Sequence, residues 1–168
     1  SRGIGRAIAV ELSRAGYRVI VTYKENVAAA EETLALIRSE GGQAEAVRFD
    51  VADSSESAAA MEDIFSRHRE IQVLVNNAGI TADGLFMMMS EENWDKVIQT
   101  TLKGFFNVTR PVVQRMVRNH RGSVVSISSV SAMMGNRGQA NYAAAKSGLI
   151  AASRTLSTEV ARLGVRVN

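Results

Sequence analysis

Two residues one helical turn apart carry the strongest chemical signal in this sequence. Tyr142 is followed four residues later by Lys146, so on a helix their side chains share a face and can meet. A lysine ammonium near a phenol favours the phenolate and lowers the phenol pKa from its usual value of about 10. A tyrosine tuned in this way can act as a general acid or base. The same spacing also arises by chance on solvated helix faces.

A serine lies thirteen residues before this tyrosine, at the end of a predicted strand. The stretch from Ser123 to Ser129 is rich in valine and serine and is typical of a buried strand. The hydroxyl of Ser129, at its end, could polarise a carbonyl group. Serine, tyrosine and lysine in this arrangement therefore point to chemistry on a carbonyl.

Helices and strands alternate along the chain. Apolar periodicity and capping residues predict helices over residues 4–15, 27–40, 54–68, 91–118 and 140–162, and strands over 17–22, 44–49, 71–75, 123–128 and 165–167. The second helix should bury Val27, Ala30, Leu34 and Ile37, and Pro111 should kink the fourth. This order implies an α/β fold with a parallel sheet covered on both faces. No linker interrupts residues 1–168, which we interpret as one domain, and both ends look cut, as in a partial sequence.

Composition narrows the possible functions. The chain has 168 residues, no cysteine, a net charge of +3 and an isoelectric point near 9.6. Disulfides and thiolate chemistry are excluded, and the charge is too small to indicate nucleic-acid binding. His68 and His120 stand apart in polar surroundings, and no metal site is expected. No apolar run reaches membrane-spanning length, and a cytoplasmic protein is expected.

Glycines at the start of the chain suggest a phosphate site. Gly3 and Gly5 open the first helix, where backbone N–H groups can approach a pyrophosphate and the helix dipole favours negative charge. A plain turn into a helix is the alternative explanation of so short a motif.

Several motifs in order resemble the short-chain dehydrogenase/reductase family of the single-domain Rossmann type, and more narrowly its 3-oxoacyl-(acyl-carrier-protein) reductases. The resemblance covers essentially the whole chain. Its motifs are Ser1-Arg2-Gly3-Ile4-Gly5, Asp50-Val51, Asn76-Asn77-Ala78-Gly79, Ser129, the stretch from Met134 through Tyr142 to Lys146, and Val165-Arg166-Val167-Asn168.

The resemblance implies roles for these residues. Tyr142 would protonate the developing alkoxide, and Ser129 would bind the substrate carbonyl. Lys146 would lower the tyrosine pKa and hold the nicotinamide ribose, and Tyr142 would also contact the cofactor. Asp50 and Val51 would border the adenine. The remaining cofactor contacts would come from Ser1, Arg2, Gly3, Ile4 and Gly5 of the phosphate turn, and from Asn76, Asn77, Ala78 and Gly79 beside the central strand.

The sequence departs from the family pattern in two places. The family's first strand and Thr-Gly pair would precede Ser1, and without that mid-sheet strand this segment would show a gap between its neighbours. The family's catalytic asparagine, which helps hold a proton-relaying water, is replaced by Thr101. A threonine hydroxyl offers fewer hydrogen-bonding sites than an asparagine amide.

The residues at the end of the family's second strand help to decide whether NADPH or NADH binds. Tyr23 and Lys24 stand where an NAD-binding fold would carry a carboxylate for the ribose 2′-hydroxyl. Arg2 could bind a 2′-phosphate, whereas Glu25 could partly offset Lys24. We therefore expect NADPH (NADP⁺) as the cofactor.

The resemblance implies NADPH-dependent reduction of a 3-oxoacyl thioester bound to acyl carrier protein, with a homotetramer as the assembly. An acetoacetyl-CoA reductase, another alcohol or ketone dehydrogenase, or a catalytically weak cofactor-binding homologue remain alternatives. The methionines at 87–89 and 133–134 either border a pocket for acyl chains or fill the core.

Overall fold

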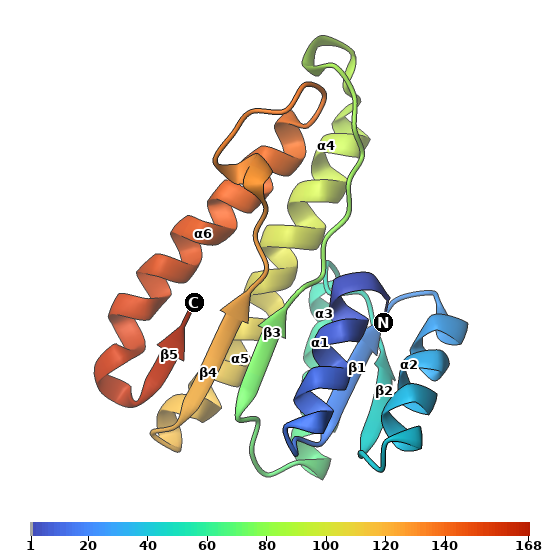
Figure 1. Cartoon of the computed structure of the whole chain (residues 1–168). Helices are drawn as coiled ribbons and strands as arrows, with labels where there is room; N and C mark the ends of the chain where they lie inside the picture. The colour runs from blue at the N-terminus through green and yellow to red at the C-terminus, as the bar shows by residue number, and fades with distance from the viewer. Residues whose placement is uncertain (1) are drawn as a thin grey trace. The chain divides into compact units, whose positions relative to one another are not determined.

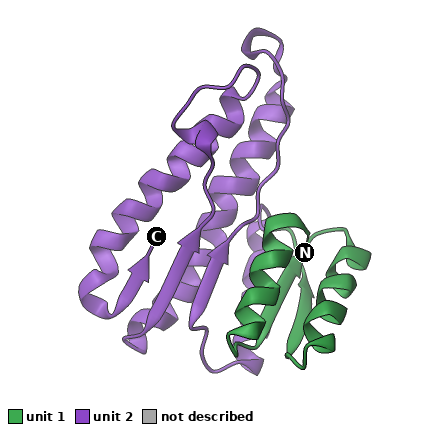
Figure 2. Ribbon diagram, viewed as in Figure 1, with its two compact units in different colours: residues 1–50 green, residues 51–168 purple. Residues whose placement is uncertain are grey.

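The computed structural model describes residues 2–168, so Ser1 of the predicted phosphate turn lies outside the described residues. The chain is an α/β protein whose strands all pair in parallel (Figure 1). It divides into two compact units, residues 1–50 and residues 51–168 (Figure 2). Each unit has its own sheet, which is the interruption in strand pairing that the sequence predicts.

Unit 1 contains two helices and two parallel strands. Its elements are α1 (Gly3–Arg14), β1 (Val19–Tyr23), α2 (Val27–Ser39) and β2 (Ala44–Arg48). β1 and β2 pair from Val19 opposite Ala44 to Tyr23 opposite Arg48. The expectation that Val27 belongs to the buried stripe of α2 is wrong, because it is 52% exposed in the first turn. The unit's core is formed by Ala9, Val19, Val21, Leu34 and Ile37.

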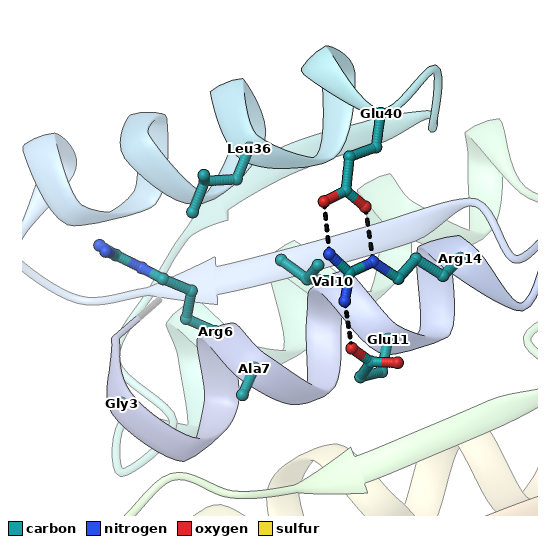
Figure 3. Close-up of a pocket in the computed structure, with 8 residues that line it drawn as sticks. All are labelled: Gly3, Arg6, Ala7, Val10, Glu11, Arg14, Leu36 and Glu40. Atoms are coloured by element: carbon teal, nitrogen blue, oxygen red, sulfur yellow. Dashed lines mark hydrogen bonds and ion pairs between the residues drawn. The ribbon is translucent and has the colours of Figure 1, made fainter.

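Polar side chains join α1 to α2 at the surface of unit 1. The Arg14 guanidinium donates to both carboxylate oxygens of Glu40 and also to Glu11 (Figure 3). Hydrogen bonding to Arg14 holds the pKa of the Glu40 carboxyl below its usual value. Because these groups are exposed, screening by solvent leaves each ion pair only a small contribution to stability. The pocket drawn in Figure 3 is an open groove between the two helices.

Unit 2 contains a three-stranded sheet in the order β3-β4-β5. Its helix α5 contacts all three strands, and α6 contacts β4 and β5. The core of the unit includes Val97, Val112, Met116, Val124 and Leu149. Its elements are α3 (Ser54–Arg67), β3 (Val73–Asn76), α4 (Glu91–Ile98), the π-helix η2 (Gln99–Lys103), α5 (Gly104–Arg118), β4 (Gly122–Ser126), α6 (Ala140–Val160) and β5 (Val165–Val167), with short 3₁₀ turns η1 (Phe86–Met88), η3 (Val130–Ala132) and η4 (Ala161–Leu163).

The helix predicted over residues 91–118 is interrupted in the structure. A π-helical turn, η2, separates α4 from α5, whereas the α-helix continues through Pro111. The Gly104 N–H bonds to the Gln99 carbonyl, five residues back, which is the π-helical pattern. A glycine is needed at this point, because a Cβ on Gly104 would lie 2.8 Å from Val51 Cγ2. Such insertions often occur at functional sites.

Candidate active site

The first turns of α6 bring Tyr142 and Lys146 together, as the sequence predicts. The Lys146 ammonium nitrogen lies 5.8 Å from the centroid of the Tyr142 ring. Tyr142 is half-buried. The two side chains therefore share one face of α6, with the cation close enough to stabilise a phenolate.

Lys146 is buried despite its charge. Its side chain is 3% exposed, and its Nζ donates a hydrogen bond to the Ile127 carbonyl oxygen at 2.6 Å. Loss of hydration on burial lowers the pKa of the Lys146 ammonium. Ser128 Oγ in turn donates to the Lys146 carbonyl at 3.3 Å, so the chain after β4 is bonded to α6 at two points.

The turn after β3 lies against the same ammonium. A Cβ built on Gly79 would be 3.3 Å from Lys146 Nζ, tighter than ordinary contact. Ala78 and Gly79 are exposed, so this turn offers backbone groups to a ligand beside Lys146. Asn76 differs, because its side-chain amide donates to Thr109 Oγ1 of α5 at 3.0 Å. The Asn76 side chain therefore fixes β3 to α5.

Ser129 lies in the segment between β4 and α6. It is half-buried, and its Oγ accepts a hydrogen bond from the Ser131 N–H at 3.2 Å. Its hydroxyl proton remains able to donate, which is what polarisation of a carbonyl requires. Ser129 follows the Ile127-Ser128 pair that contacts Lys146, which places it in the same part of unit 2.

Thr101 lies in the π-helical turn, and this turn contacts α6. The side chain is 2% exposed, and among residues 2–168 its Oγ1 is the one buried side-chain nitrogen or oxygen without a hydrogen-bond partner. A buried hydroxyl left unbonded costs about 1–3 kcal/mol. This position therefore suits a group that binds a small polar ligand such as water.

In unit 1 the start of α1 has the features of a phosphate-binding turn. Gly3 has a φ of +52°, which favours glycine, and the first turn carries no acidic residue. Arg2, at the N-cap, makes no side-chain capping bond, so the first N–H groups of α1 keep their positive potential. Arg2 and Ile4 are exposed and Gly5 is half-buried. These residues fit an anionic phosphate.

The residues expected near the adenosine ribose form an ion-pair cluster in unit 1. Lys24 Nζ lies 2.8 Å from Asp50 Oδ2 and 3.8 Å from Glu25 Oε1. Asp50 follows β2 and Lys24 follows β1, so the pairing of parallel strands brings their side chains together. Tyr23, the last residue of β1, is half-buried. Asp50 therefore offsets part of the positive potential that we expect from Lys24.

Sequence reasoning missed two asparagines of unit 2. Asn107 of α5 donates to the Val51 carbonyl at 2.8 Å and so holds the half-buried residue expected beside the adenine. Asn141, which precedes Tyr142, is completely buried and makes three hydrogen bonds. Nothing in its spacing predicts these bonds, although an asparagine in the first turn of a helix is itself a signal for side-chain to backbone bonding.

The methionines at 87–89 and 133–134 are not core residues, and of these only Met89 is half-buried. Met87, Met88, Met133 and Met134 are 89%, 79%, 76% and 65% exposed. They belong to two loops that meet where the Gly84 N–H bonds to the Gly138 carbonyl at 2.8 Å, at the top of Figure 1. The interpretation of these four as core filler is therefore wrong.

Comparison with known proteins identifies the family. The short chain dehydrogenase family model matches residues 1–168. The chain belongs to the short-chain dehydrogenase family. It is therefore an oxidoreductase acting on CH–OH or C=O groups, and the family implies a nicotinamide cofactor. Among residues 2–168, no helix combines the length and apolar character needed to cross a bilayer.

Curated members of the short-chain dehydrogenase family match the chain along its whole length. It is 42% identical to the 3-oxoacyl-[acyl-carrier-protein] reductase FabG of Staphylococcus aureus (strain N315), over 100% of this chain and 68% of the relative. It is 43% identical to the 3-oxoacyl-[acyl-carrier-protein] reductase of Synechocystis sp. (strain ATCC 27184 / PCC 6803 / Kazusa), again over 100% of this chain and 68% of the relative. The chain thus spans about two thirds of each relative's length.

The described residues fit a nicotinamide cofactor. In unit 2, Gly79 leaves room beside the buried Lys146 ammonium, where a side chain would crowd the nitrogen. In unit 1, the uncapped start of α1 suits phosphate groups. These observations come from the residues of this chain and not from its relatives, and they agree with its membership of the short-chain dehydrogenase family.

Proposed function

We propose that this protein reduces a 3-oxoacyl thioester carried on acyl carrier protein to the 3-hydroxyacyl thioester, with NADPH as cofactor. We further propose that residues 1–168 belong to one Rossmann-type domain. The observation that carries the proposal is the buried Lys146 ammonium beside Tyr142. The printed names of the relatives support the choice of substrate.

In the proposed reaction the residues of unit 2 manage the proton. The nicotinamide cofactor, when bound, supplies the hydride that forms the new C–H bond. Ser129 donates a hydrogen bond to the substrate carbonyl oxygen and holds it towards Tyr142. The Tyr142 phenol transfers its proton to that oxygen, and the Lys146 ammonium stabilises the phenolate left behind. Solvent then returns a proton to Tyr142.

The carrier of the acyl group, either acyl carrier protein or coenzyme A, distinguishes the leading proposal from the acetoacetyl-CoA reductase alternative. The exposed methionines of the two loops offer flexible apolar surface to an acyl chain, whatever its carrier. In the full-length protein, kcat/KM for the same 3-oxoacyl group should be higher on acyl carrier protein than on coenzyme A. A preference for coenzyme A would favour the acetoacetyl-CoA reductase alternative.

We expect a preference for NADPH over NADH. No carboxylate stands at the end of β1, and Arg2 is exposed, so its guanidinium can bind a 2′-phosphate. Because Lys24 pairs with Asp50, we expect Arg2 to contribute more than Lys24 to binding of the 2′-phosphate. The measurement is kcat/KM for both cofactors in wild-type and Arg2→Ala full-length protein. Arg38→Ala, in the last turn of α2, is the control. A wild-type preference for NADH, or an NADPH preference that Arg2→Ala leaves intact, would contradict this prediction.

We expect Thr101→Asn to raise turnover or leave it unchanged. The buried Thr101 hydroxyl can bind a relaying water, but an asparagine amide offers more hydrogen-bonding sites for the same task. Steady-state kcat of the full-length variant is the measurement, with the exposed Thr158→Asn on α6 as control. A large loss of rate would mean that threonine is the better-fitted residue at this position. Absence of turnover in both wild type and variant would favour the catalytically weak homologue.

We also propose a homo-oligomer, with a tetramer as the expected state. Phe106 on α5 is 51% exposed, and its ring lies 5.3 Å from Lys103 Nζ and 5.7 Å from the Arg110 guanidinium carbon. A large aromatic side chain on an outer helix face suits a protein interface. Phe106→Glu should lower the mass measured by light scattering of the full-length protein, whereas Leu36→Glu on α2 should not. A stable wild-type monomer at micromolar concentration would contradict the proposal.

A further inference from the structure

Asn141 is the most fully enclosed polar side chain near the proposed proton donor. It lies in the first turn of α6, next to Tyr142, and its exposed fraction is 0%. Its Nδ2 donates to the Ala82 carbonyl at 3.0 Å and to the Asn93 carbonyl at 3.1 Å, and its Oδ1 accepts from the Tyr142 N–H at 2.8 Å. Both amide hydrogens and the amide oxygen therefore have partners.

These partners belong to three separate segments of unit 2. Ala82 lies in the segment that follows the cofactor turn at 76–79, Asn93 lies in α4, and Tyr142 lies in α6. The two donor bonds span 59 and 48 residues of sequence. One side chain thus fixes the start of α6 to both other segments, and it does so at the residue before the reacting phenol.

A second set of bonds joins the segment of Ala82 to the residues just before α6, nearer the surface. Gln139 Nε2 donates to Asp83 Oδ2 at 3.0 Å, and the Gly84 N–H donates to the Gly138 carbonyl at 2.8 Å. The Gln139–Asp83 bond is exposed, whereas Asn141 is fully enclosed. Buried hydrogen bonds hold geometry more strongly than exposed ones, because breaking them leaves polar groups without water. Asn141 is therefore the fully enclosed hydrogen-bonded link between these segments.

We propose that Asn141 is a positioning residue, which holds the backbone of Tyr142 so that its phenol faces the Lys146 ammonium. This inference rests on the proposed role of Tyr142 as proton donor. The distance between the Lys146 nitrogen and the Tyr142 ring depends on how the first turn of α6 is held, and Asn141 bonds directly to the Tyr142 amide. Misplacement of a catalytic group by about 1 Å can cost about 10²-fold in rate.

Asn141→Asp is the sharpest variant, because it separates the two kinds of bond. Aspartate keeps an oxygen for the Tyr142 N–H, but at neutral pH it loses both donors to Ala82 and Asn93. Asn141→Ser is the second variant; its small side chain removes the two-carbonyl bridge without burying a charge, and it serves if the aspartate variant does not fold. Ser153→Ala is the matched control: Ser153 is also buried in α6 and donates to Ser126 Oγ at 3.0 Å, eleven residues beyond Tyr142.

We expect each Asn141 variant of the full-length protein to lose about 10- to 100-fold in kcat, with a much smaller change in KM. The loss should fall on kcat rather than KM, because the bonds of Asn141 hold the backbone of the proposed proton donor and not the substrate. Ser153→Ala should lower the melting temperature and leave kcat unchanged.

Wild-type kcat in a folded Asn141 variant would overturn the proposal. So would an equal loss of kcat in Ser153→Ala, since loosening of α6 in general would then explain it. Hydrogen exchange of the Tyr142 amide provides a readout independent of turnover: it should be faster in Asn141→Ser, where the bond to Asn141 Oδ1 is removed, and unchanged in Ser153→Ala. If Tyr142→Phe retains activity, the proposed reaction fails. The exchange measurement would still show whether Asn141 holds the backbone of residue 142.

Discussion

Tyr142→Phe should nearly abolish ketone reduction by the full-length protein. Phenylalanine keeps the ring and its packing but removes the hydroxyl proton that we expect to reach the substrate oxygen. Positioned general acids contribute about 10²- to 10⁴-fold, so we expect kcat to fall by about 10³-fold or more. Steady-state kcat with a 3-oxoacyl thioester and saturating NADPH is the measurement.

The loss should be confined to this tyrosine. Tyr17→Phe changes a partly exposed tyrosine that precedes β1 in unit 1, and it should leave kcat at the wild-type value. Cofactor binding measured by fluorescence should remain close to wild type in Tyr142→Phe, because the ribose contact is expected from Lys146. Near-normal reduction by Tyr142→Phe would exclude Tyr142 as the proton donor.

Lys146→Met should produce the second-largest loss of turnover. The change removes the cation that lies 5.8 Å from the Tyr142 ring, so the phenolate formed in the proposed reaction should lose its stabilisation. It also removes the expected ribose contact. We expect kcat to fall by about 10²-fold or more, with KM for NADPH raised. Lys96→Met, at an exposed position on α4, should leave both constants unchanged.

The same substitution should change how stability depends on pH. Burial lowers the pKa of Lys146 below its reference value of 10.5. At pH values below this folded-state pKa, the buried ammonium destabilises the native protein. The destabilisation decreases as the pH rises from the folded-state pKa towards 10.5. The melting temperature of the wild type, relative to that of Lys146→Met, should therefore increase between pH 7 and pH 10. The opposite trend would show that the surroundings of the ammonium stabilise it. The difference in melting temperature between the wild type and Lys96→Met should not change with pH.

Local signals in the sequence predicted most of the elements and the proximity of Tyr142 to Lys146. Tyr142 and Lys146 share a face because four residues make about one helical turn, which needs no information from the rest of the chain. Asp53 caps α3 through the Ser55 and Glu56 N–H groups, which lie two and three residues further along the chain. Parallel pairing followed from the alternation of helices and strands. These features depend on neighbours within a few residues.

Other features depend on segments that are distant in sequence, and only the tertiary structure decided them. The burial of Lys146 arises from Ile127 and Gly79, which approach it from the segments after β4 and β3. Lys24 loses part of its expected role because β1 and β2 place Asp50 beside it. The π-helical turn at Thr101 has no periodicity that distinguishes it from a continuous helix.

Asn141 shows the same division most clearly. Its residue type before Tyr142 is visible in the sequence, but its bonds to Ala82 and Asn93 cross 59 and 48 residues of chain. Whether an asparagine is a solvated side chain or a buried tie depends on which carbonyl groups the fold brings to it. The sequence by itself determined which residues can transfer a proton. The tertiary structure decided which of them are enclosed and held, because desolvation and hydrogen-bond geometry arise only when distant segments pack together.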